Sequence, residues 1–366
     1  MIENNLHSLC RTPSIARLEL HQYSNLPKIR RVIYPSLLDC FPARLPSLGL
    51  PLLRDLYNNM SPMNDPYFLS LLRETEEDEL KYQKALSSDT YCMQEMKSFM
   101  NKSMHVCDEY GGWAGDFFIG MVVNRFIEIV NEKGDEFVDW IDEEKTYLLR
   151  LLSQLKLVEV TDDMMLIPGA LSPKLEKLID LLVEEYNRGS SSFSGIIFVE
   201  QRVGVAVLAE ILARHPRTKD IFRCGTLVGA SQHSGHTGKH LSELVNTKKM
   251  KNTLADFRRG VFNLIVVTSV AEEGLDIQAC HLVVCCHMLQ TKKSYVQMRG
   301  RARRGDSTYV LMFPNEILAD SSLKSLEKWE NEMLEAYRDE NRKLSENVTI
   351  EDDEAGTEKY FIQETK

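Results

Sequence analysis

The chain has 366 residues, of which 43% are hydrophobic and 27% charged, a composition typical of a globular protein with a sizeable core. No apolar run approaches the ~20 residues of a membrane-spanning helix, and the N-terminus lacks the basic-then-apolar pattern of a signal peptide. The eight cysteines form no CxxC pair, so neither a disulfide framework nor a zinc site is expected. We therefore expect an intracellular protein, cytoplasmic or nuclear, without membrane contact.

The charge is distributed unevenly along the chain. The formal net charge of −10 argues against a nucleic-acid partner. Residues 190–313, however, hold 17 basic and 9 acidic side chains, a local charge of +8, so the remainder carries −18. Such asymmetry is typical of a nucleic-acid-binding module inside an acidic protein.

The N-terminal part is predicted to be a linker followed by helices. Residues 25–35 are expected to be an extended linker, and residues 41–53, FPARLPSLGLPLL, a loop punctuated by prolines. Residues 66–160 show helical periodicity throughout. Ser172 then predicts the N-cap of a helix that begins at Pro173 and stops at Gly189.

After Gly189, short apolar strands alternate with helices, which predicts an α/β fold with a parallel sheet covered on both faces. The helix predicted within 292–304 includes the arginine-rich end of KKSYVQMRGRARR. A long amphipathic helix follows Pro314, and an acidic tail ends the chain. The expected strands are SGIIFVEQ, FRCGTLVG, FNLIVVTS, CHLVVCCHM and STYVLMFP.

Two loops carry candidate chemistry, the segment TSVAEEGLD (268–276) and a turn with four arginines within 299–304. Ligands of open α/β sheets bind outside the carboxyl ends of strands, so we expect both loops at that edge. Thr268 can donate to phosphate, Gly274 permits close backbone approach, and Asp276 can accept from a sugar hydroxyl. Taken singly, the first loop is explained as well by a capped connection and the second by a solvated basic turn.

Together these segments resemble superfamily 2 helicases. NLIVVTSVAEEGLDIQACHLVV followed by SYVQMRGRARR resembles motifs V and VI, and SGIIFVEQRVGVAVLAEIL resembles motif IV. The amino-acid sequences of motifs V and VI are most similar to those of the branch that contains Dicer and the innate-immune double-stranded-RNA helicases. NLPKIRRVIY and CDEYGGWAGDFFIGMVV look like the linker and helical insertion of fungal Dicer-like proteins. The resemblance implies a RecA-like second helicase lobe, an all-α insertion domain and a long C-terminal helix.

The resemblance also implies roles for individual residues. Gln297, Arg301 and Arg304 would face ATP, with the arginines stabilising charge on the γ-phosphate. Gly274 and Asp276 would contact the nucleotide as well. Double-stranded RNA would be the partner, contacted by Thr268, Lys239, Lys248, Lys249 and Lys251.

The chain differs from the family pattern because the motifs of the first helicase lobe are not found in its sequence. There is no GxxxxGK[S/T] phosphate loop, and the acidic pairs within 108–109 and 142–144 lie in helical sequence instead of forming a DExH motif. We therefore expect Mg²⁺ to be held by an absent first lobe, and the chain alone to be inactive. The parent protein would carry that lobe and ribonuclease III domains. His233, His236 and His240 lack a cysteine or carboxylate nearby in the sequence, so no metal site is expected there.

The predicted division has five parts: a linker (1–50), a helical insertion (51–170), a RecA-like domain (171–315), a bridging helix (316–344) and an acidic tail (345–366). Two alternatives stay open. The lobe could be of innate-immune or archaeal type, or the chain could be a non-catalytic RNA-binding or scaffold module derived from a helicase.

Overall fold

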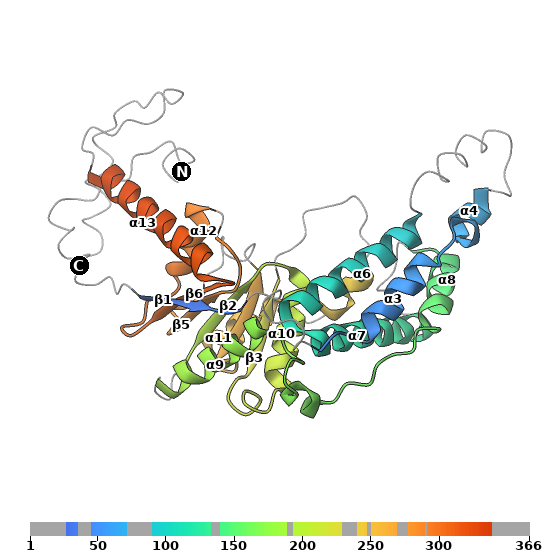
Figure 1. Ribbon diagram of the computed structural model, residues 1–366, viewed down its shortest axis with the longest axis horizontal. Coiled ribbons are helices and arrows are strands. Elements are labelled where there is room, and N and C mark those ends of the chain that lie inside the picture. The colour runs from blue at the N-terminus through green and yellow to red at the C-terminus, as the bar shows by residue number, and fades with distance from the viewer. Residues whose placement is uncertain are drawn as a thin grey trace, which may run out of the picture. The chain divides into compact units, whose positions relative to one another are not determined.

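The computed structural model describes residues 27–35, 45–71, 90–132, 140–188, 193–228, 240–246, 250–268, 277–289 and 291–338. The stretch from Leu26 to Ser322 belongs to one compact unit, which contains a bundle of helices and a sheet (Figure 1). Helix α13 (Glu316–Arg338) begins in this unit, and its part beyond Ser322 belongs to a second unit.

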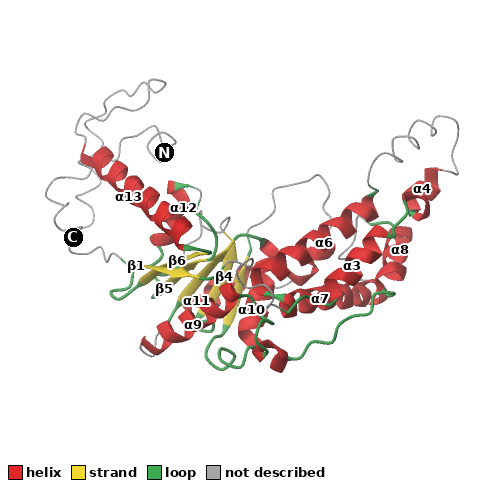
Figure 2. Cartoon of the chain, viewed as in Figure 1, coloured by secondary structure: helices red, strands yellow, loops and turns green. Residues whose placement is uncertain are grey.

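A six-stranded sheet forms the α/β part, and every pair of neighbouring strands in it is parallel (Figure 2). The strand order is β1-β6-β5-β2-β4-β3. All residues of β2, β4, β5 and β6 are buried, as expected for strands covered on both faces. The predicted α/β class is confirmed. The strands are β1 (Lys28–Ile33), β2 (Gly195–Val199), β3 (Cys224–Leu227), β4 (Leu264–Thr268), β5 (Leu282–Cys285) and β6 (Thr308–Phe313).

Ends were predicted for two of the helices around the sheet, and one of the two is an exception. Ser172 caps α9 as predicted, because its hydroxyl accepts from the Leu175 N–H at 3.2 Å. The exception is α12, which ends at Arg299 instead of continuing through the arginines, since the next residues turn to pair with Cys280. The helices are α9 (Pro173–Arg188), α10 (Arg202–Arg214), η4 (Leu241–Asn246), α11 (Met250–Arg258) and α12 (Lys292–Arg299).

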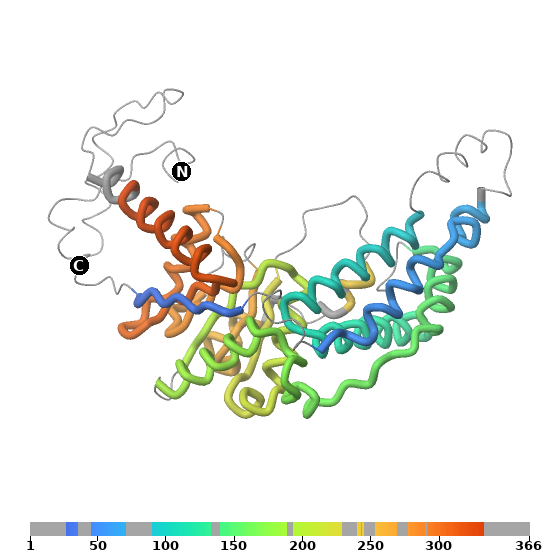
Figure 3. Tube along the Cα trace, viewed as in Figure 1, coloured from blue at the N-terminus to red at the C-terminus, as the bar shows by residue number. Residues whose placement is uncertain are grey.

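Residues 28–33 are extended, as predicted, but they are part of the sheet. Strand β1 pairs with β6 from Lys28 opposite Thr308 to Ile33 opposite Phe313, so segments from the two ends of the chain lie side by side (Figure 3). Arg30 donates to Glu184 and Glu185 of α9 at 2.7 and 2.9 Å. Neighbouring arginine side chains point to opposite faces of a strand, so Arg31 reaches Asp320 of α13 instead, at 2.9 Å.

The helical part is built without any strand in the described residues between 45 and 188. Its centre is aromatic, and Phe99, Phe118 and Phe126 are completely buried. Its elements are α3 (Gly49–Asn58), η1 (Pro62–Asn64), α4 (Pro66–Leu71), α6 (Tyr91–Tyr110), α7 (Gly112–Glu132), α8 (Asp142–Leu152) and η3 (Asp162–Leu166).

Helix α3 occupies part of the proline-rich stretch that was predicted to be a loop, so that prediction was wrong. A carboxylate from a distant helix explains the difference. Asp116 of α7 accepts from the N–H groups of Leu48 and Gly49 at 3.1 and 2.8 Å, and from the Ser47 hydroxyl. The carboxylate thus supplies both the hydrogen-bond acceptors and the negative charge that a helix N-terminus favours.

We expect Asp116→Ala to lower the free energy of unfolding by about 3 kcal/mol, because it removes the shared acceptor of three donors at a nearly buried site. Chemical denaturation of the chain measures this. Asp142→Ala is the matched control, since Asp142 also lies at a helix N-terminus but is exposed, and it should shift the midpoint much less. Equal midpoints for the two variants would contradict the capping role.

The helical part and the sheet share one hydrophobic core, which runs from Leu53 of α3 to Met312 of β6. Their contact also contains an ion pair between Glu109 of α6 and Lys174 of α9, and the Lys174 ammonium lies 5.7 Å from the Tyr34 ring centre. These contacts attach the helical part at the carboxyl edge of the sheet, where β1 ends. No helix within the described ranges is long and apolar enough to cross a membrane.

Candidate functional site

The arginine turn, residues 299–304, lies at the amino edge of the sheet. Thr308 follows it after residues 305–307 and pairs with Leu282 and Lys28, which are the first residues of β5 and β1. The expectation that the turn lies outside the carboxyl ends was therefore wrong. Helix α12 runs antiparallel to the strands, as crossover helices do, and returns the chain to the opposite edge before the arginines occur.

The turn is held against the segment that precedes β5. The Cys280 N–H donates to the Arg301 carbonyl at 2.9 Å, and Cys280 also pairs with Ala302 in a β-bridge. Arg304 Nε donates to the Ala279 carbonyl at 3.3 Å. The first contact joins two backbone groups and fixes where Arg301 leaves the turn, and the second ties the Arg304 side chain itself to the backbone of Ala279.

The four arginines of the turn differ in their contacts. Arg299 lies over the ring of the buried Tyr295, with 5.7 Å between its guanidinium carbon and the ring centre. Arg303 donates to the Gly300 carbonyl within the same turn. Arg301 is half-buried and Arg304 exposed, and Gln297 lies half-buried one helical turn before Arg301. Contacts with the backbone of residues 279–280 therefore position two of the four arginines, Arg301 and Arg304.

Thr268 lies at the opposite, carboxyl edge of the sheet. It ends β4 beside Val199 of β2, is 2% exposed, and its hydroxyl has no hydrogen-bond partner among the described residues. The chain is described again from Ile277, close to the arginine turn at the amino edge. Thr268 and the arginine turn are thus on opposite edges but joined by a short connection. Gly274 and Asp276 lie outside the described residues.

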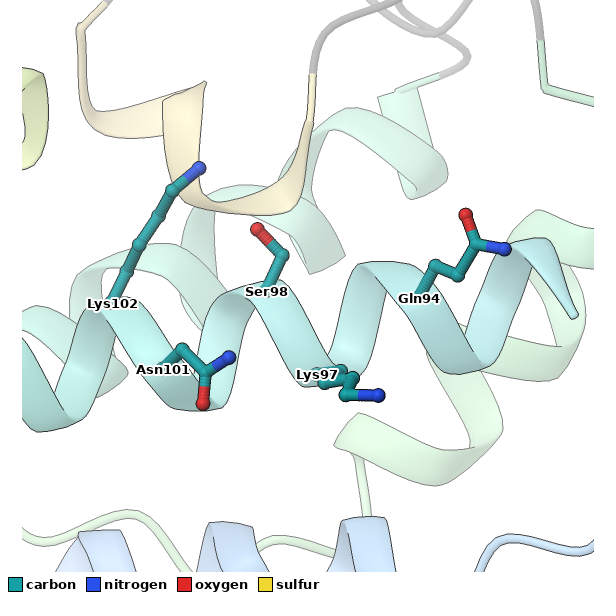
Figure 4. Close-up of a pocket in the computed structure, with 5 residues that line it drawn as sticks. All are labelled: Gln94, Lys97, Ser98, Asn101 and Lys102. Carbon is teal, nitrogen blue, oxygen red and sulfur yellow. The ribbon is translucent and has the colours of Figure 1, made fainter. Parts of the chain in front are cut away.

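The structure shows a polar surface on α6 that the sequence analysis missed. Five side chains line a hollow along this helix, and Lys102 reaches from it to Ser242 of η4, with 2.7 Å between Nζ and Oγ (Figure 4). Lysines and amides that recur at helical spacing in 94–102 were the available signal. The lining residues are Gln94, Lys97, Ser98, Asn101 and Lys102.

The start of η4 is fixed to the same helix by a buried carboxylate. Glu95 is 3% exposed, accepts from the Leu241 N–H at 3.1 Å and lies 2.5 Å from His240 Nδ1. His240 is the first described residue after Lys239 in the sequence. Lys239, Lys248 and Lys249 lie outside the described residues, as does the side chain of Lys251 in α11.

The acidic pairs that superficially resemble a DExH motif, and the histidines that resemble metal ligands, were considered as alternative sites. Glu144 caps α8 by accepting from the Ile141 N–H at 3.3 Å, and Glu109 pairs with Lys174. His233 and His236 lie outside the described residues, and His240 pairs with Glu95. Within the described ranges no group of three or more His, Cys, Asp or Glu side chains could hold a metal ion.

Cys280 is next to the arginines but is not an activated thiol. Burial raises the pKa of Cys280 to about 12, although Ser194 and the positive charges of Arg304 and Arg301 act in the opposite direction. The thiol therefore stays protonated at neutral pH, and its Sγ donates to the Gln278 carbonyl at 3.2 Å. Cys280 serves the packing of the turn and supplies no nucleophile.

Comparison with known proteins identifies the family to which the sheet and the arginine turn belong. Residues 173–306, from the start of α9 to just before β6, match the helicase conserved C-terminal domain. Over its full length the chain is 37% identical to Dicer-like protein 2 of Aspergillus terreus and to Dicer-like protein 2-1 of Aspergillus niger. The chain corresponds to the helicase C-terminal region of a Dicer-like protein.

This Dicer-like chain spans 26% of the length of each of those relatives. Among solved structures, the Pyrococcus furiosus Hef helicase domain is 18% identical, with 88% of this chain and 63% of that one covered and a TM-score of 0.37. The match to the helicase conserved C-terminal domain, residues 173–306, includes the arginine turn and Thr268, whereas the helical part and β1 lie outside it.

Proposed function

We propose that this Dicer-like chain is the second helicase lobe and helical insertion of an ATP-dependent double-stranded-RNA helicase. It would complete an ATP site together with a first lobe and translocate on RNA in gene silencing and antiviral defence. The observation that carries the proposal is the arginine turn, fixed by hydrogen bonds to the backbone of Ala279 and Cys280 at one edge of the sheet while Thr268 lies at the other.

The amino edge has the chemistry for the phosphates of a nucleotide. Guanidinium groups stay charged and donate in a planar fork that matches phosphate oxygens. Arg301 and Arg304 come from a turn whose backbone is fixed, so their positions do not have to be reorganised when ATP binds. ATP would supply the scissile γ-phosphate bond, and Mg²⁺ would be held by the first lobe.

The carboxyl edge and the helical part would together contact RNA. The deep major groove of duplex RNA excludes side chains, so contacts must be made to phosphates and to the 2′-hydroxyls of the minor groove. The α6 hollow offers lysines and amides suited to both, and Lys239 would add a further contact, since it directly precedes His240 in the sequence and His240 is bound to Glu95 of α6. Thr268 would add a hydroxyl contact from the sheet if RNA binding opens the end of β4, since the hydroxyl is buried in this structure.

The two edges are joined by the connection from Thr268 to Ile277, which would couple RNA binding to hydrolysis. A movement of β4's end by RNA is transmitted through only eight residues to the segment that holds the arginine turn. The predicted domain division remains part of this proposal, with β1 as an additional strand of the RecA-like domain. Ribonuclease III domains would belong to the parent protein.

Assembly with a first lobe tests this function. We expect no ATP hydrolysis by the purified chain, because it lacks a phosphate loop and magnesium-binding carboxylates. The two-lobe protein, meaning this chain joined to the first helicase lobe from the same organism, should hydrolyse ATP faster when duplex RNA is added. Turnover by the chain alone would contradict the proposal, and a two-lobe protein that binds RNA without turnover would favour the scaffold alternative.

A further inference from the structure

His281 connects the arginine turn to the centre of the sheet at the amino edge. Its Nδ1 accepts from the Ser194 N–H at 3.2 Å, and the Ser194 hydroxyl lies 3.1 Å from the same nitrogen. The main chain adds two bonds, from the His281 N–H to the Ser194 carbonyl at 2.9 Å and from the Thr308 N–H to the His281 carbonyl at 2.8 Å. The ring also stacks on Phe193, with 13° between the planes. His281 therefore joins β2, β5 and β6 where each begins.

The Ser194 contact determines the protonation state of the imidazole. A backbone N–H can only donate, so Nδ1 must present a lone pair and the ring hydrogen must lie on Nε2. An imidazolium, which donates from both nitrogens, cannot accept this bond. The neutral ring is therefore the one that fits the site.

The surrounding charges act in the same direction. Burial and then the positive charge of Arg304 lower the pKa of His281. Arg301 and Arg304 both face the neighbouring Cys280, and the carboxylate of Glu185 meets the Thr308 hydroxyl at 3.3 Å. No acidic side chain among the described residues is paired with the imidazole, so protonation would place a third positive charge beside the two arginines.

The residues directly before His281 are those that hold the turn. Ala279 accepts from Arg304, and Cys280 donates to the Arg301 carbonyl. Any displacement of His281 relative to Ser194 moves these two residues as well, because they are covalently continuous with it. The imidazole contact thus helps to fix the 279–281 segment, and with it both arginines, to Ser194 at the start of β2, together with the Cys280 side chain and the main-chain bonds.

We propose that His281 is a positioning residue for the arginine turn: its neutral imidazole, bound to Ser194, holds Arg301 and Arg304 in place for ATP. The inference rests on the proposed function, since a nucleotide site is what makes the placement of these arginines matter. It adds a pH response. The contact is complete above about pH 6.5, the ordinary pKa of histidine, and is lost as the pH falls through the lower pKa of His281 in the folded chain.

Two amide variants of the two-lobe protein separate this role from general packing. In His281→Asn the side-chain oxygen takes the place of Nδ1 and can accept from Ser194, so kcat at neutral pH should stay near that of the wild type. An amide does not titrate, so the part of the activity loss at low pH that comes from His281 should disappear. In His281→Gln the oxygen lies one bond farther out, so kcat should fall about tenfold with KM little changed. Equal activities of the two variants, or an unchanged acid limb in His281→Asn, would overturn the proposal.

A second measurement does not depend on hydrolysis. Nitrogen-15 NMR of the histidines in the unmodified chain should show His281 as the Nε2–H tautomer, titrating below the ordinary range. An Nδ1–H tautomer, or a pKa at or above about 6.5, would overturn the inference. If the two-lobe protein hydrolyses no ATP, the proposed function fails, and this spectrum alone then decides whether His281 is bound to Ser194.

Discussion

Replacing Arg301 or Arg304 by alanine should lower the RNA-stimulated kcat of the two-lobe protein about 10³-fold, the effect of removing an arginine finger in phosphoryl transfer. The affinity for duplex RNA should stay close to that of the wild type, because the arginine turn lies at the amino edge of the sheet and the proposed RNA contacts lie at the carboxyl edge. Steady-state kinetics and RNA titrations on the same preparations measure both quantities.

Two further variants sharpen the arginine test. Arg303→Ala is the matched control, since Arg303 is exposed, is in the same turn and donates to Gly300 instead of to the 279–280 segment. It should hydrolyse ATP almost normally. Arg304→Lys keeps the charge but loses the Nε donor to Ala279 and the planar fork, so it should be nearly as impaired as Arg304→Ala. Loss of RNA affinity in parallel with activity would instead make these arginines phosphate contacts of the RNA.

Binding of duplex RNA by the two-lobe protein should weaken steeply with salt. Each neutralised phosphate releases counterions and contributes about −0.9 to the slope of log affinity against log salt. If all six candidate lysines contact phosphates, the slope is about −5, and affinity falls about 10³-fold between 50 and 200 mM salt. Binding should not depend on RNA sequence. The lysines are Lys97 and Lys102 of the α6 hollow, Lys239, Lys248, Lys249 and Lys251.

Single lysine variants locate these contacts. Lys97→Ala should make the slope shallower by about 1, whichever duplex sequence is used. Lys219→Ala is the control, because Lys219 is equally exposed but lies in the turn after α10, at the amino edge of the sheet. Equal slopes for Lys97→Ala and the wild type would remove the α6 hollow from the RNA interface. Salt-independent affinity would remove nucleic acid from the function altogether.

If nucleotide binds at the amino edge and RNA at the carboxyl edge, as proposed, the two binding sites have to be coupled across the lobe. Thr268 and the arginine turn do not share a surface, so coupling between them must pass through the sheet and the Thr268–Ile277 connection. Buried parallel strands deform little because they are packed on both faces. We therefore expect a displacement at the carboxyl edge to be transmitted to the amino edge instead of being absorbed between them.

Local patterns in the sequence were sufficient for the strands and helices of the α/β part. Continuous apolar runs predicted β2 to β6, since strands buried on both faces have no solvent side to carry polar residues. The Ser172-Pro173 pair predicted the start of α9, because a cap depends on residues within one turn. The density of arginine and the sequences of motifs IV to VI likewise indicated a helicase lobe, because both are properties of short, continuous stretches of the chain.

Tertiary structure alone decided the features that depend on distant residues. Strand β1 is polar and exposed along much of its length, and only pairing with β6, some 280 residues away, makes it part of the sheet. Helix α3 forms in a proline-rich stretch because Asp116 accepts its first N–H groups. His281 meets Ser194 only once β2 and β5 are neighbours. In each case the partner is remote in sequence, so no window of neighbouring residues contains the interaction that determines the structure.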